Sequence, residues 1–158
     1  MESLYGRIAC CIDRDPMAKL VVAEGLRLAG GDPAALSIVH VVAPAHALGA
    51  GPYAYVVPIQ ELRGEAEEWV GELARGVPAA ARVVLDGLPG REVCAWAQAE
   101  GVDLIVASAH RGLVERAFLG GFASYLAYHA PCAVLLVRPR GETPDHLPAA
   151  EATRAGRA

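Results

Sequence analysis

The residues of this chain best suited to hold an anion are a pair of glycines and the polar loop before them. Gly120 and Gly121 directly precede a helical pattern. Because glycine lacks a side chain, backbone N–H groups there can approach a phosphate closely, and the dipole of the following helix favours negative charge. Ser108, His110 and Arg111 carry further donors in that loop. A tight turn and a solvated polar loop explain the same residues, so both interpretations stay open.

Asp13 is a second candidate, because it directly follows the apolar run from Ile8 to Ile12. A carboxylate at the end of a strand can accept hydrogen bonds from the hydroxyl groups of a ribose. It can also cap the next helix, which is predicted to begin near Pro16, and Asp15 could form the same cap. On this residue alone, the cap is the favoured interpretation.

The sequence contains no readable catalytic set. His40 lies within an apolar stretch and is predicted to be a satisfied histidine of the sheet. No nucleophile with a base and an orienting group emerges, and the phosphate-binding patterns G-x-x-x-x-G-K-[ST] and G-x-G-x-x-G after the first strand are both absent. The cysteines form no C-x-x-C pair and are predicted to be buried thiols in a reducing compartment, without a structural metal.

Strand and helix patterns alternate along the chain and must position these residues. Five apolar runs are predicted as strands, at 8–12, 36–42, 81–85, 104–107 and 133–137. Alternation of this kind predicts a doubly wound α/β domain, with a parallel sheet covered by helices on both faces. Ligands of such sheets bind beyond the carboxyl ends of the strands. We therefore expect Asp13, residues 41–44 and residues 107–121 to meet at one edge.

Composition limits the class of protein. The 158 residues are 54% hydrophobic and 20% charged, with a net charge of −4. This excludes global disorder and offers no basic excess for nucleic acid. Residues 33–60 carry no charge, but four prolines there argue against a membrane span. With no N-terminal secretory pattern, we expect a cytoplasmic protein. One domain is predicted over residues 1–140, and the Pro-, Ala- and Gly-rich residues 141–158 are predicted to be a disordered tail.

Several stretches resemble the universal stress protein family, and the likeness spans roughly residues 4–140. They read IACCID at 8–13, LSIVHVV at 36–42, VLDGLPGREV at 84–93, GVDLIVASAH at 101–110 and HAPCAVLLVR at 129–138. The resemblance implies the strand order 3-2-1-4-5, in a fold like that of the adenine nucleotide alpha hydrolases.

Nucleotide-binding members of that family carry G-x-x-G-x9-G-[ST]. On this chain the pattern falls on Ala107, His110, Gly120 and Gly121, and only Gly120 matches strictly. The resemblance also implies that Asp13 contacts the ribose and that the backbone of the residue after the strand-two histidine contacts adenine. The nucleotide contacts implied in this way are Asp13, Val41, Val106, Ala107, His110, Arg111, Gly120, Gly121 and Phe122.

The resemblance implies a homodimeric stress-response regulator or sensor that binds ATP or AMP, with magnesium accompanying ATP. Its last strand, Ala133 to Val137, is expected to be an apolar edge that pairs with a second copy, and replacing Leu135 with proline is expected to leave a monomer. Two alternatives remain. One is a dimeric scaffold of the same fold without nucleotide, and the other is a slow ATPase, for which no general base is apparent.

Overall fold

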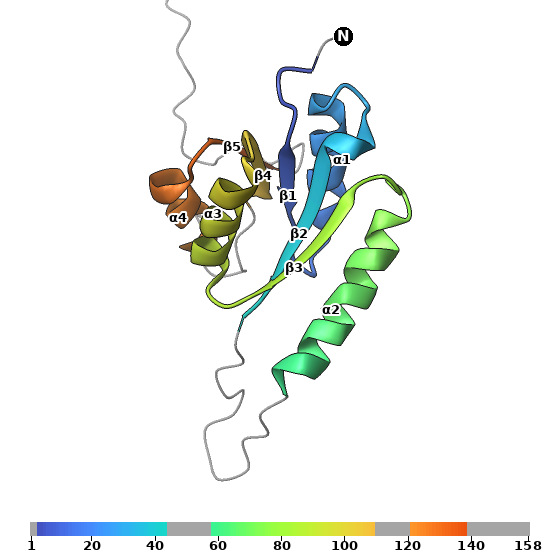
Figure 1. Ribbon diagram of the computed structural model, residues 1–158, viewed down its shortest axis with the longest axis vertical. Helices are drawn as coiled ribbons and strands as arrows, with labels where there is room; N and C mark the ends of the chain where they lie inside the picture. The colour runs from blue at the N-terminus through green and yellow to red at the C-terminus, as the bar shows by residue number, and fades with distance from the viewer. Residues whose placement is uncertain (1–2, 44–57, 110–120, 139–158) are drawn as a thin grey trace, which may run out of the picture.

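A five-stranded parallel sheet carries the fold in the computed structural model, which describes residues 3–43, 58–109 and 121–138 (Figure 1). The order along the sheet is β3-β2-β1-β4-β5, and every neighbouring pair is parallel. The predicted architecture and strand order are thus confirmed. The elements are β1 (Ile8–Cys11), α1 (Ala18–Leu28), a 3-10 turn (Pro33–Ala35), β2 (Leu36–Val42), α2 (Ile59–Ala74), β3 (Ala81–Asp86), α3 (Pro89–Glu100), β4 (Leu104–Ser108), α4 (Gly121–His129) and β5 (Ala133–Val137).

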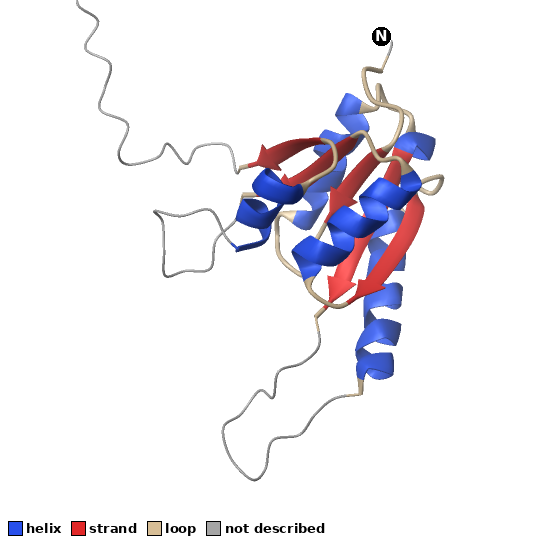
Figure 2. Cartoon of the chain, turned by 60° about the vertical axis from the view of Figure 1, so that its left-hand side comes forward, coloured by secondary structure: helices blue, strands red, loops and turns tan. Residues whose placement is uncertain are grey.

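The helices cover the two faces of the sheet in pairs (Figure 2). Side chains alternate along a strand, so neighbouring residues enter different cores. Cys10 packs in the core under α1 and α2, together with Val21 and Val70. Cys11 packs in the core under α3 and α4. The adjacent cysteines therefore point to opposite faces of the sheet. Among the described residues, no helix has the length and apolar character needed to span a membrane.

The first helix starts later than predicted, and neither aspartate caps it. Its cap position is Met17, and no side chain accepts a hydrogen bond from the first turn. The Asp15 carboxylate instead accepts a hydrogen bond from the Met17 N–H at 2.7 Å. That of Asp13 accepts one from the Arg14 N–H at 2.8 Å. Both carboxylates thus shape the turn between β1 and α1, because short aspartate side chains satisfy nearby backbone groups most easily.

The two edges of the sheet differ in how their backbone groups are occupied. Along β3, the guanidinium of Arg63 donates to the Val84 carbonyl at 3.1 Å and also pairs with the Asp86 carboxylate. A side chain from α2 therefore blocks part of that edge. In the described part of the chain, no side-chain hydrogen bond reaches the outer edge of β5 in a comparable way. Within the described ranges, the edge of β5 is thus the less occupied of the two.

Gly25→Ala is expected to lower the free energy of unfolding by about 1–3 kcal/mol, because α1 crosses β1 closely at this residue. An added Cβ would collide with Cys10 Sγ and lie 3.4 Å from a methyl of Leu36. Urea unfolding measures the change. Gly64→Ala, an exposed position of α2 with no atom within 4 Å of the added Cβ, is the control and should be neutral or stabilising.

Removing the colliding sulfur tests this explanation. The Gly25→Ala, Cys10→Ala double variant should be less destabilised than the sum of the two single variants, since the two side chains share one space. Additive effects would show that the collision does not cause the loss.

Candidate functional site

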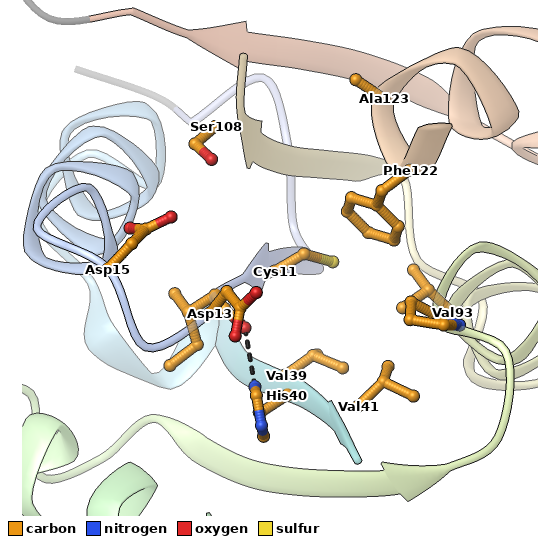
Figure 3. Close-up of a pocket in the computed structure, with 12 residues that line it drawn as sticks. Cys11, Asp13, Asp15, Val39, His40, Val41, Val93, Ser108, Phe122 and Ala123 are labelled. Atoms are coloured by element: carbon orange, nitrogen blue, oxygen red, sulfur yellow. Dashed lines mark hydrogen bonds between the residues drawn. The ribbon is translucent and has the colours of Figure 1, made fainter. Parts of the chain in front are cut away.

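A pocket of about 300 Å³ opens where β1, β2 and β4 end (Figure 3). Because β1 pairs with β2 on one side and β4 on the other, the pocket lies at the point where the strand order reverses. Small molecules bind to doubly wound sheets at this point. Its lining residues are Cys11, Ile12, Asp13, Asp15, Val39, His40, Val41, Pro89, Val93, Ser108, Phe122 and Ala123.

One side of the pocket is apolar. Figure 3 shows Phe122 of α4, Val93 of α3 and Val41 of β2 grouped on this side. All three belong to the core between the sheet and the α3–α4 pair, and Phe122 and Val41 are half-buried. A half-exposed ring beside aliphatic side chains offers a flat apolar surface. Such a surface suits a planar aromatic ligand.

The opposite side is acidic, with Asp13 and Asp15 on the turn after β1 (Figure 3). Each carboxylate is held through its Oδ1 atom by the backbone N–H groups described above. The Oδ2 atoms can accept hydrogen bonds from hydroxyl groups of a ligand. Two carboxylates repel a phosphate, however, so an anionic group must lie elsewhere in the pocket. Ser108, at the end of β4, adds a hydroxyl group to the lining of the pocket.

The backbone of Val41 adds a donor and an acceptor beside the apolar side. The β1–β2 ladder ends where the Ile12 N–H donates to the Val39 carbonyl at 2.9 Å. The Val42 carbonyl accepts from the Gly87 N–H at 3.1 Å and therefore faces β3. Since these groups alternate along a strand, the N–H and C=O of Val41 face the opposite side, beyond the end of β1. Among the described residues, neither group forms a backbone hydrogen bond there.

His40 links the pocket to α2. Its Nδ1 lies 2.9 Å from the Ile12 carbonyl oxygen. The ring packs edge-on against Trp69, with 5.3 Å between ring centroids. The expectation that this histidine is satisfied within the sheet agrees with both contacts. It also lines the pocket, which the sequence did not indicate.

The residues expected to bind nucleotide are placed differently in the structure. Asp13, Val41 and Phe122 line the pocket. Val106 and Ala107 are fully buried in β4 and are not among the lining residues.

The glycine-rich part of the expected site is only partly described. Gly121 is the exposed first residue of α4, and an added Cβ there would meet no atom within 4 Å. His110, Arg111 and Gly120 lie outside the described residues, as do residues 44–57 and the predicted tail at 141–158.

Several lining residues were not selected from the sequence as ligand contacts. Two of them, Cys11 of β1 and Val39 of β2, could have been inferred from the sequence, because side chains alternate between the two faces along a strand. Pro89 and Val93 of α3 and Ala123 of α4 reach the pocket only because these helices pack beside the strand ends. No local pattern indicates that approach.

The thiols are poor nucleophiles and show no metal site. Burial raises the pKa of Cys10 to about 12 and also raises the pKa of Cys11, so both stay protonated at neutral pH. All four cysteines are free. In the portion of the chain that is described, no three metal-binding side chains gather in one place. The pocket therefore offers binding groups, with Cys11 acting as part of its apolar lining.

Comparisons with known proteins point to one family. The model of the universal stress protein family matches residues 4–138. Universal stress protein Sll1388 of Synechocystis sp. is 28% identical over 152 residues, covering 85% of this chain and 98% of its own.

Solved structures share the fold. Universal stress protein UspA of Lactobacillus plantarum matches with a TM-score of 0.62 at 23% identity, covering 85% of this chain and 98% of its own. An AMP-bound family protein of Arabidopsis thaliana matches with a TM-score of 0.54 at 16% identity, covering 89% and 96%. The structural matches concern the fold alone, whereas the family model spans most of the sequence. The chain belongs to the universal stress protein family.

Proposed function

We propose that this chain is a homodimeric stress-response regulator or sensor that binds an adenine nucleotide, ATP or AMP, in the pocket at the strand ends. The observation that carries the proposal is the N–H and C=O of Val41 beside the apolar surface of Phe122 and Val93. Adenine presents a ring-nitrogen acceptor next to an amino donor on a flat apolar ring. The backbone pair and the apolar surface match those features.

The rest of the pocket suits the remaining parts of a nucleotide. The carboxylates of Asp13 and Asp15 can accept hydrogen bonds from ribose hydroxyls. We assign the phosphate to Ser108, which lines the pocket, and to Gly121, the first residue of α4, because a helix N-terminus favours negative charge. The glycine-motif resemblance adds His110, Arg111 and Gly120 as phosphate contacts, and magnesium would accompany ATP. The AMP bound to the Arabidopsis relative supports the same ligand class.

The base is tested with AMP and IMP in titration calorimetry. IMP replaces the amino donor of adenine by a carbonyl and places a hydrogen on the neighbouring ring nitrogen. The Val41 N–H would then face a ring N–H, and the Val41 C=O would face a carbonyl. Both hydrogen bonds would be lost, so IMP should bind at least about 10-fold more weakly than AMP. Equal affinities for AMP and IMP would contradict recognition of adenine by the Val41 backbone. No affinity for AMP or ATP would favour the scaffold without nucleotide. Timed incubation with ATP and magnesium separates binding from slow hydrolysis.

The ribose contact is tested with Asp13→Ala. Losing a hydrogen bond to a charged acceptor should weaken AMP binding about 10-fold. Affinity for 2′,3′-dideoxyadenosine monophosphate, which lacks the hydroxyls, should stay the same. Glu68→Gln, an exposed carboxylate change on α2, serves as the control for altered net charge. A similar loss for both ligands would assign Asp13 to the turn and not to the ribose.

The proposed dimer forms through β5. The backbone groups of Val137 point toward β4, because its carbonyl accepts a hydrogen bond from the Ala109 N–H at 2.8 Å. Backbone groups alternate in direction along a strand, so those of Ala133 and Leu135 also point toward β4. Those of Val134 and Leu136 point outward. Two outward rows related by a two-fold axis satisfy each other in one interface. The partial block of β3 by Arg63 favours β5 over the other edge.

We place the protein in the cytoplasm. The four cysteines are free, and two of them are buried. Free thiols persist in reducing compartments.

A further inference from the structure

The ladder between β1 and β2 stops one hydrogen bond early. The register pairs Cys11 with Val39, and the Ile12 N–H donates to the Val39 carbonyl at 2.9 Å. In a regular parallel ladder, the next bond would run from the Val41 N–H to the Ile12 carbonyl. Among the described residues that bond is absent. The Ile12 carbonyl is instead within 2.9 Å of His40 Nδ1.

We propose that His40 is a positioning residue: its Nδ1–H occupies the Ile12 carbonyl and so keeps the Val41 N–H available to a ligand. A side chain thus replaces a backbone donor, and the ladder ends where the pocket begins. The consequence for ligand binding rests on the proposed nucleotide function. The diversion of the Ile12 carbonyl does not depend on it.

The surroundings hold the imidazole in this arrangement. A carbonyl can only accept, so the hydrogen-bonded nitrogen Nδ1 must carry a hydrogen. The ring meets Trp69 edge-on, at an interplanar angle of 73°. The guanidinium of Arg14 lies 5.8 Å from the ring centroid of the same tryptophan and 3.8 Å from the Glu65 carboxylate. The packing on α2 therefore restricts rotation of His40 away from Ile12.

The same hydrogen bond anchors the turn that carries the acidic side of the pocket. Ile12 directly precedes Asp13, and the Asp13 carbonyl accepts from the Asp15 N–H at 2.8 Å. Holding the Ile12 carbonyl on β2 therefore fixes the start of this turn. One side chain thus affects two parts of the pocket, the donor at Val41 and the carboxylates at Asp13 and Asp15.

The first test is amide hydrogen exchange by NMR on ligand-free protein. His40→Val suits a buried parallel strand but removes the donor, so the Val41 N–H should bond to the Ile12 carbonyl and exchange at least about 10-fold more slowly. His40→Asn places an amide N–H near the position of Nδ1 and should keep the fast exchange of the unmodified protein. Slow exchange of Val41 in the unmodified protein, or equal rates in His40→Val, would overturn the proposal.

The second test is affinity for AMP by calorimetry. His40→Val should weaken binding about 10-fold or more, whereas His40→Asn should stay within about 3-fold of the unmodified protein. Equal losses in both variants would indicate a merely structural role and contradict the proposal. If the unmodified protein itself fails to bind AMP, the proposed function fails, while the exchange rates still decide the role of His40. Should His40→Val not fold, long-range ¹H–¹⁵N NMR of the unmodified protein decides, because an Nδ1 without hydrogen would overturn the assignment.

Discussion

Gly90→Ala is expected both to destabilise the fold and to weaken ligand binding in the proposed nucleotide pocket. Gly90 is buried near the start of α3, and an added Cβ would lie 2.6 Å from Cδ1, 2.7 Å from Cγ and 2.9 Å from Cβ of Tyr125. These atoms are close to the backbone of α4, so relief requires the helices to separate. Overpacking of this kind costs about 1–3 kcal/mol of unfolding free energy.

The same separation acts on the pocket, because α3 contributes Val93 to its lining and α4 contributes Phe122. Displacing the Phe122 ring removes an aromatic contact worth about 1 kcal/mol, so affinity for AMP should fall about 5-fold. Urea unfolding and calorimetry measure the two effects, with Gly64→Ala as the control. Adding Tyr125→Ala to Gly90→Ala should recover part of the affinity. Unchanged stability of Gly90→Ala would contradict the close approach of the helices.

Leu136→Pro is expected to convert the proposed dimer into a folded monomer. The N–H of Leu136 faces outward from β5, so proline removes a donor to the second copy and leaves the β4–β5 ladder intact. Leu135→Pro is the matched comparison, because the N–H of Leu135 faces β4 and its loss breaks the sheet. It should lower the free energy of unfolding by about 3 kcal/mol or more.

Light scattering gives the mass and circular dichroism confirms the fold. The unmodified protein should have about twice the chain mass of 16.5 kDa, and Leu136→Pro should have the mass of one chain. A single-chain mass for the unmodified protein would rule out the dimer. A dimer that survives in folded Leu136→Pro would place the interface elsewhere. The expectation that Leu135→Pro leaves a monomer is thus replaced by Leu136→Pro, because register decides which backbone groups of β5 face outward.

Local patterns were sufficient to predict the elements of the fold. The apolar run at Leu36–Val42 was predicted as a strand with the bounds that the structure has. Gly101 follows the last residue of α3 and adopts φ 65°, a left-handed conformation that glycine tolerates and that a local sequence signal can indicate. Such features depend on residues a few positions apart. The start of α1 was predicted less well, because Asp13 and Asp15 bond within their own turn.

The strand pattern predicted the candidate site only where its residues end a strand, and Phe122 of α4 came from the family resemblance. Asp13 and Val41 could be selected because a doubly wound sheet places its ligands at the carboxyl ends of the strands. Val93 could not, since it reaches the pocket through the packing of α3 against the sheet. Ala107 falls on the glycine pattern of the family, yet it is fully buried beside the pocket. A motif assigns positions along the chain and does not tell which side chains face the cavity.

The sequence by itself determined the α/β class, the order of the elements and the edge at which a ligand would bind. Alternating apolar runs, and glycines that end helices, determine those features through short-range contacts. Only the tertiary structure decided that His40 hydrogen-bonds to the Ile12 carbonyl and that Gly90 packs closely against Tyr125. It also decided that the backbone N–H of Leu136 points outward. Each of these depends on register and packing between segments distant in sequence. Long-range packing of this kind selects one partner among several that local chemistry allows.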